Sequence, residues 1–171
     1  MMHTKYLLTF LFTTAFSLSA CGTSHNNRPN NSSLPAKTLI TTTLFSSSNC
    51  NINEQGITEV TDELALQSII NKAYSHILNT KPTTIPPINF KSSMIYLIAL
   101  GSKPNTGYAL KSLGKEASYE HGVLSLPLKV QHPSKEGMYA QMMTSPCTLI
   151  SVPSGIYKQI NIQGWEYFLQ E

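Results

Sequence analysis

The side chains that could do chemistry are scattered along the chain and match no known catalytic or metal-binding pattern. The five histidines are His3, His25, His76, His121 and His132. None of them has a cysteine, a second histidine or a carboxylate at the spacing of metal ligands. Serine is common, but neither a G-x-S-x-G nor an S-x-x-K arrangement marks a nucleophile. We therefore predict no catalytic residue, no metal site and no cofactor. One catalytic alternative stays open, a small exported hydrolase in which His121 or His132 works with a serine.

The carboxylates that lie near one another in sequence have structural explanations. Asp62 and Glu63 fit the start of a helix, where acids oppose the positive end of the helix dipole. Glu116 and Glu120 fit a solvated hairpin loop. A glycosidase would need two acids projecting into one cleft, and the sequence predicts no such pair.

Composition sets further limits on the function. The chain has 171 residues, enough for one folded domain with its own core. Charged residues make up 12% of it, against about 25% in ordinary domains. Its 12 basic and 9 acidic residues give a net charge of +3, too weak and dispersed for a nucleic-acid partner. These values also exclude a multi-pass membrane protein and a large multidomain enzyme.

The N-terminus has the three-part plan of an export signal. Lys5 precedes a ten-residue apolar run, residues 7–16, and small residues follow it. As a helix this run would reach about 15 Å, half of a roughly 30 Å hydrocarbon core, which is too short to span a bilayer. Residues 1–20 are therefore predicted to be a signal peptide.

The sequence Leu18-Ser19-Ala20-Cys21 resembles the lipobox of bacterial lipoproteins. The resemblance implies cleavage before Cys21 and attachment of acyl chains to this cysteine, and two or three chains anchor a protein stably. Gly22, in place of an aspartate, favours the outer membrane. We expect residues 21–37 to form the lipidated cysteine and a flexible tether, and residues 38–171 to form a single globular domain in the bacterial cell envelope.

The other two cysteines are Cys50 and Cys147. An exported compartment permits a disulfide between them. Two alternatives remain open, that both are free thiols or that Cys147 is a small buried apolar residue.

One helix and several strands are predicted for the domain. Thr61 fits an N-cap, and an apolar stripe recurs at helical spacing from Leu66 to Ile77, so the helix should end near Asn79. Strands are expected at residues 39–45, 57–60, 94–100, 108–113, 123–131, 138–144, 147–152, 157–162 and 165–169. The seven apolar residues 94–100 predict a strand covered on both faces. Pro127 predicts an edge strand or a bulge. The expected class is α+β, an antiparallel sheet or small sandwich with one packed helix.

The loop between two of these strands is the strongest candidate for a binding surface. Its residues are Lys103, Pro104, Asn105, Thr106, Gly107 and Tyr108. Gly107 permits positive φ, so one interpretation is a plain hairpin connection. The other is that the loop presents backbone groups and an aromatic side chain to a protein partner.

Several segments appear in an order that resembles the C-terminal domain of the protease complex subunit PrcB family. They are the apolar strand 94–100, Gly101, Pro104, the T-G-Y loop ending at Tyr108, and the T-S-P segment at residues 144–146. The resemblance implies a non-catalytic lipoprotein subunit that associates with an exported protease and stabilises it. The loop is also similar to that of chagasin-type inhibitors, so inhibition of a protease is an alternative. A purely structural envelope lipoprotein is another.

Overall fold

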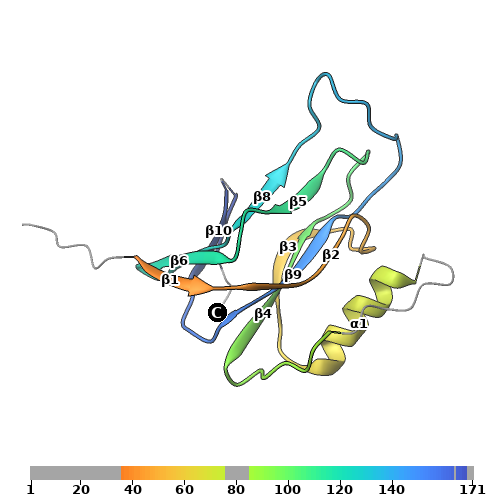
Figure 1. The fold of residues 1–171 in the computed structure, drawn as a ribbon. Helices are drawn as coiled ribbons and strands as arrows, with labels where there is room; N and C mark the ends of the chain where they lie inside the picture. Colours follow the sequence, from red (N-terminus) through yellow and green to blue (C-terminus); the bar gives the residue numbers. More distant parts are fainter. Residues whose placement is uncertain (1–35, 76–84, 164, 169–171) are drawn as a thin grey trace, which may run out of the picture. The chain divides into compact units, whose positions relative to one another are not determined.

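The computed structural model describes residues 36–75, 85–163 and 165–168, and Figure 1 shows their arrangement. The elements in these ranges are β1 (Lys37–Ile40), β2 (Thr42–Ser47), β3 (Gln55–Val60), α1 (Glu63–Tyr74), β4 (Ser93–Leu100), β5 (Ala109–Ser112), β6 (Glu116–Glu120), β7 (Val123–Ser125), β8 (Leu128–Gln131), β9 (Cys147–Pro153), β10 (Gln159–Ile162) and β11 (Trp165–Phe168). The predicted signal peptide, Cys21, His25 and His76 lie outside the described residues.

The strands pair in three open sheets. Their orders are β1-β6-β7-β10-β11, β2-β9-β4-β3 and β5-β8. Neighbouring strands in the described residues run antiparallel except β7 and β10, which are parallel. The protein is therefore mostly β-sheet with a short helix, which agrees with the predicted α+β class. None of the described helical residues belongs to a helix that is long and apolar enough to cross a bilayer.

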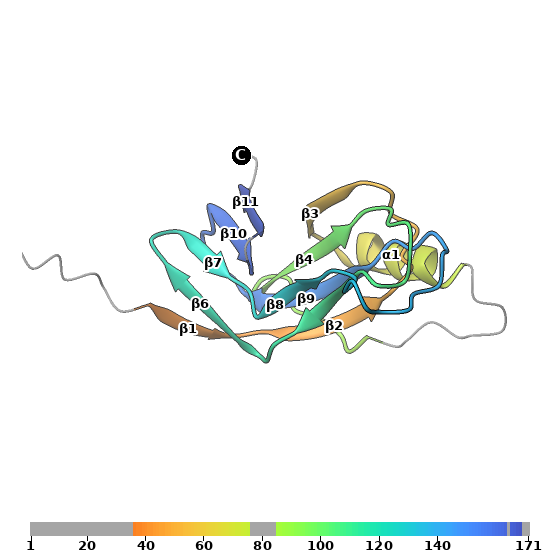
Figure 2. The ribbon, with the colours of Figure 1, turned by 90° about the horizontal axis from the view of Figure 1, so that it is seen from above.

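Strand β4 lies at the centre of the fold and is covered on both faces, as its apolar run predicts. Ile95, Leu97 and Ala99 pack in one cluster with α1. The alternating residues Tyr96 and Ile98 pack in a second cluster, which includes residues of β7 and β10. Figure 2 shows β4 and β9 between α1 and the β7–β10 pair. The four-stranded sheet is thus the middle of three layers.

Helix α1 begins one residue later than the sequence predicts. Asp62 is the N-cap, and its carboxylate accepts a hydrogen bond from the Ala65 N–H at 2.8 Å. Thr61 was expected in this role, but an aspartate caps a helix at least as well and stands one position closer to the first turn. The predicted stripe is confirmed, since Leu66 and Ile70 are buried. The predicted end near Asn79 lies outside the described residues.

The predicted strand at residues 39–45 is two strands in different sheets. Thr41 separates β1 from β2, and both its N–H and its hydroxyl donate to the Lys115 carbonyl, at 2.7 and 3.0 Å. This pair of bonds turns the chain from β6 toward β9. The β-branched sequence continues through Thr41 without a break, which is why the switch has no local signal.

Pro127 also marks a change of sheet. The sequence predicts a single strand at residues 123–131, but the chain leaves β7 after Ser125 and enters β8 at Leu128. The Leu126 N–H donates to the Asn161 carbonyl, and the Pro127 carbonyl accepts from Leu113 at 2.8 Å. Proline has no N–H to give to a ladder, so the ladder is interrupted there.

Two further expectations are wrong. Residues 116–120 form strand β6, where a solvated loop was expected, because Ala117 is buried while the two glutamates remain exposed. Residues 138–143 form no strand although their apolar composition predicts one, and only Thr144 makes an isolated bridge, to Lys103. Apolar residues do not form a strand where no neighbouring strand is available to pair with them.

Cys50 and Cys147 are joined by a disulfide with a Cα–Cα distance of 5.9 Å. The bond connects the segment after β2 with the first residue of β9. The Cys50 N–H donates to the Ser145 carbonyl at 2.8 Å. Both cysteines are completely buried in the cluster beneath α1.

Candidate functional site

Residues 103–108 follow β4 and lead to β5 (Figure 1). They are hydrogen-bonded to residues 140–144. Lys103 anchors the start of the loop, since its N–H donates to the Thr144 carbonyl at 2.7 Å and its carbonyl accepts from the Thr144 N–H at 2.9 Å. The Thr144 hydroxyl donates to the Asn105 carbonyl at 3.1 Å. The predicted binding loop is therefore held by a second loop that is distant in sequence.

The middle of the loop is fixed by side-chain hydrogen bonds. The Asn105 carboxamide oxygen accepts from the Gly107 N–H at 2.9 Å, which is an Asx turn. Thr106 bonds to Ala140 twice, since its N–H donates to the Ala140 carbonyl and its hydroxyl accepts from the Ala140 N–H, both at 3.1 Å. These backbone groups are used within the protein, so they cannot serve a partner without rearrangement.

Gly107 is required for space rather than for its backbone conformation. It is buried, and it is not among the glycines with positive φ, which are Gly101, Gly114 and Gly122. A Cβ at position 107 would lie 2.6 Å from the Pro133 Cβ and 2.9 Å from the Tyr139 ring. The sequence predicts a glycine here for its freedom of φ, whereas in the structure the close approach of the second loop is what requires it.

Tyr108 faces the interior of the site. Its ring packs edge-on against His132 with a centroid distance of 5.7 Å. The Lys103 ammonium lies 5.6 Å from the centroid of the same ring, in cation–π geometry. The aromatic residue of the predicted loop thus lies close to two basic side chains.

The second loop carries exposed methionines. Met138 is fully exposed, and Met142 and Met143 are 55% and 64% exposed. The loop between them is held by the Tyr139 hydroxyl, which accepts from the Ser134 N–H at 2.9 Å. Hydrogen bonds from the side chain and backbone of Ser134 lower the pKa of Tyr139. A fixed backbone therefore presents flexible apolar side chains, and we call Met138, Met142 and Met143 the methionine patch.

The six residues of the predicted loop are exposed to different degrees. Pro104 and Thr106 are exposed, Gly107 is buried, and the other members are partly buried. Residues 103–108 expose no large apolar side chain, whereas the second loop exposes Met138, Met142 and Met143.

Residues 94–153 match the family model described as PrcB C-terminal. The resemblance found in the sequence is confirmed for this region, and the PrcB family points to a protein partner in a protease complex. No curated protein and no solved structure matches the chain.

The PrcB C-terminal match includes β4, β9 and both loops. It begins within β4 at Met94 and ends at Pro153, the last residue of β9. Helix α1 and the last two strands lie outside it. The methionine patch therefore belongs to the matched region, whereas Trp165 does not.

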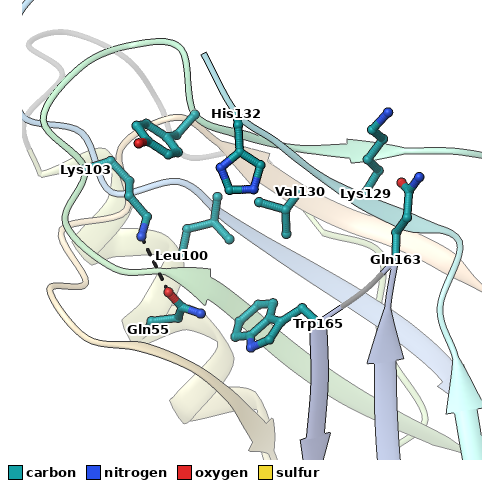
Figure 3. Close-up of a pocket in the computed structure, with 9 residues that line it drawn as sticks. Gln55, Leu100, Lys103, Lys129, Val130, His132, Gln163 and Trp165 are labelled. Atoms are coloured by element: carbon teal, nitrogen blue, oxygen red, sulfur yellow. Dashed lines mark hydrogen bonds between the residues drawn. The ribbon is translucent and has the colours of Figure 1, made fainter. Parts of the chain in front are cut away.

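A pocket of about 310 Å³ lies beside the loops (Figure 3). Its lining residues are Gln55, Leu100, Lys103, Tyr108, Lys129, Val130, His132, Gln163 and Trp165. Figure 3 shows Lys103 and His132 directed toward the centre and the Trp165 indole facing them across it. Strands far apart in sequence build this pocket, so no local pattern predicts it.

The histidines and carboxylates in the described part of the chain do not gather. The His121 imidazole lies 3.5 Å from the adjacent Glu120 carboxylate on the surface. His132 contacts Tyr108, and no hydrogen bond to a serine is found for either histidine in residues 85–163. The same described residues contain no group of three or more potential metal ligands of the cysteine, histidine, aspartate and glutamate types.

Sequence reasoning missed the methionine patch and Trp165. The sequence predicts a strand at residues 138–144, so it does not identify the exposed methionines. Trp165 had no local signal, because its position in the pocket depends on the turn between β10 and β11.

Proposed function

We propose that this chain is a non-catalytic binding subunit, attached to the bacterial envelope, whose partner is an exported protease. The methionine patch, supported by residues 103–108, is the proposed contact surface. The observation that carries the proposal is this exposed apolar group on a hydrogen-bonded base within the PrcB C-terminal match.

The physical argument concerns what a partner can bury. Exposed apolar patches mark interaction sites when they lie together, and methionine adapts its shape to an apolar partner. The backbone beneath the patch is already ordered by the bonds of Thr106 to Ala140 and of Thr144 to Lys103. Binding would therefore order few additional backbone groups, which favours affinity.

The test is co-purification of protease activity from envelope extracts. The variant Met138→Ser/Met142→Ser/Met143→Ser should recover at least about tenfold less protease than the wild type, because truncation of a single hot-spot residue costs at least about 2 kcal/mol of binding free energy. A matched control replaces three exposed apolar residues elsewhere, Leu64, Leu113 and Ile156, with serine. Equal recovery by the two triple variants would refute the proposed surface.

The same complex distinguishes stabilisation from inhibition. Purified protease is incubated with and without the subunit, and both the initial rate and its decay are measured. A stabilising subunit leaves the initial rate unchanged and slows the decay, because a ligand of the native state protects that state. An inhibitor lowers the initial rate in proportion to the fraction bound.

We further propose that Cys21 carries the membrane anchor. The lipobox sequence supports this, and acyl chains contribute about 0.8 kcal/mol per buried CH₂ group. Mass spectrometry of the purified protein should find the N-terminus at Cys21 with acyl chains attached. An N-terminus at another residue, or an unmodified Cys21, contradicts the anchor.

A further inference from the structure

The pocket that Lys103 and Tyr108 of the predicted loop help to line combines positive charge with apolar surface. Lys103, Lys129 and His132 are its basic residues, and none of its lining residues is acidic. Leu100, Val130 and Trp165 supply apolar surface. Such a lining suits a ligand that carries a negative charge next to an apolar group.

Lys103 is the residue best placed to meet that charge. Its ammonium donates to the Gln55 carboxamide oxygen at 3.5 Å and lies over the Tyr108 ring. An ammonium has three N–H donors, so the bond to Gln55 leaves donors for a ligand. Figure 3 shows this ammonium directed into the pocket, with Lys129 and Gln163 on the other side. Lys129 therefore adds to the positive potential at longer range.

Size limits the ligand further. A volume of about 310 Å³ is at the lower end of ligand pockets, which range from about 300 to 1,000 Å³. It accommodates one or two amino-acid side chains and not a folded element. A C-terminal residue fits both requirements at once, because one Cα carries a carboxylate and a side chain. An internal glutamate offers only two methylene groups beside its charge.

We propose that this pocket binds the C-terminal residue of a protein partner, with the carboxylate at Lys103 and an apolar side chain against Trp165. The inference rests on the proposed function, since it concerns the same partner. It adds the pocket to the contact surface proposed for the methionine patch. Lys103 belongs both to this pocket and to the loop 103–108. Recognition by charge and by an apolar side chain together would select the end of a chain.

The experiment uses the fluorescence of Trp165, which is the only tryptophan in the chain. The full chain in detergent is titrated with the peptide Gly-Ala-Ala-Leu with a free carboxylate, and with the same peptide as its C-terminal amide. The free acid should cause a saturable change in Trp165 fluorescence. The amide should bind at least about tenfold more weakly, because it cannot form the charge-assisted hydrogen bond of the carboxylate. No saturable change up to millimolar free acid, or equal binding of the amide, overturns the proposal.

Variants assign the carboxylate to Lys103. Lys103→Gln should weaken binding of the free acid about tenfold, and Lys129→Gln about twofold to threefold. The matched control is Lys91→Gln, an exposed lysine beside the opposite end of β4, which should leave binding unchanged. Equal affinity of the Lys103 and Lys91 variants overturns the assignment. Tighter binding of an amidated peptide with an internal glutamate overturns the preference for a chain end.

Iodide quenching gives a second measurement that needs only the wild-type protein. The measured quantity is the ratio of the quenching constant of iodide to that of neutral acrylamide. Because iodide is an anion, this ratio should be higher for Trp165 than for free tryptophan. Added chloride should lower the ratio for Trp165. A ratio no higher than that of free tryptophan contradicts a positive pocket. A negative result in these fluorescence experiments would overturn the pocket proposal but would not affect the protease-recovery test of the methionine patch. Unchanged protease recovery by the methionine variant would overturn the proposed function itself.

Discussion

The central sheet and the paired loops beside it are built in opposite ways. Every residue from Ile95 to Leu100 in β4 is buried, and apolar clusters cover both faces of that strand. Residues 138–143 are held by a few hydrogen bonds and turn three methionines outward. The two regions therefore differ in what holds them, which is apolar burial in the sheet and a few hydrogen bonds in the loops. Changes in the sheet should affect unfolding, and changes in the methionine patch should affect binding.

The largest expected effect tests the sheet. Replacing Cys50 and Cys147 together with alanine should lower the free energy of unfolding by about 2–5 kcal/mol, because the bond closes a long loop of the unfolded chain. The sequence separation of the two cysteines is 97 residues. Urea unfolding followed by circular dichroism measures the loss. An unchanged midpoint, or a midpoint insensitive to reduction of the wild type, would show that the bond contributes no stability.

The next largest effect is expected at the contact between the loop 103–108 and the second loop. Gly107→Ala should destabilise the protein by about 1–3 kcal/mol, because the new methyl group meets Pro133 and Tyr139. Gly56→Ala is the matched control, since a Cβ there meets no atom within 4 Å. Its effect should stay within about 0.5 kcal/mol. Similar melting temperatures for the two variants would mean that the loops separate easily.

A smaller effect concerns the buried tyrosines. Burial raises the pKa of both Tyr96 and Tyr157 above the ordinary value of 10.0. The folded state then holds phenolic protons that the unfolded state loses, so stability is complete below pH 10 and falls as the pH rises above it. Tyr96→Phe should reduce this fall by about 1 kcal/mol between pH 10 and pH 11.

At pH 7 the two tyrosines should differ. Within the described residues the Tyr96 hydroxyl donates to the Met94 sulfur alone, at 3.8 Å, whereas Tyr157 donates to the Pro153 carbonyl at 2.6 Å. Tyr157→Phe should therefore cost about 1 kcal/mol, and Tyr96→Phe less. Urea unfolding curves at pH 7 and pH 11 give the free energy of unfolding of each variant. If the free energy of the Tyr96 variant falls with pH as steeply as that of the wild type, the burial argument is contradicted.

The smallest effect on stability should come from the methionine patch. The triple serine variant should unfold within about 0.5 kcal/mol of the wild type, because exposed side chains contribute little to the folded state. Differential scanning calorimetry measures this. A loss above 2 kcal/mol would place the methionines in the core and remove the contrast between the two regions.

The sequence predicted the main elements where a local pattern matched the final environment. The helix stripe through Leu66 and Ile70 and the apolar run of β4 were both interpreted correctly. The divisions at Thr41 and Pro127 were not, because each depends on a carbonyl or N–H from another part of the chain. Residues 138–143 show the converse error, in which apolar composition predicted a strand that has no partner.

The candidate site was predictable in part. The loop 103–108 and the PrcB resemblance follow from residue types and their order. The role of Gly107 required the position of Pro133, and the pocket required Lys103, His132 and Trp165 to meet. These residues come from three separate segments, so their meeting depends on the pairing of sheets.

The amino-acid sequence by itself determined the predominance of strands, the amphipathic helix α1 and the family resemblance of residues 94–153, because each depends on periodicity or on a short motif. Tertiary structure alone decided where the chain passes from one sheet to another and which backbone groups of residues 103–108 are hydrogen-bonded within the protein. It also decided which side chains line the pocket. The physical reason is that hydrogen-bond partners and apolar contacts from distant segments set these features, and local preference does not specify them.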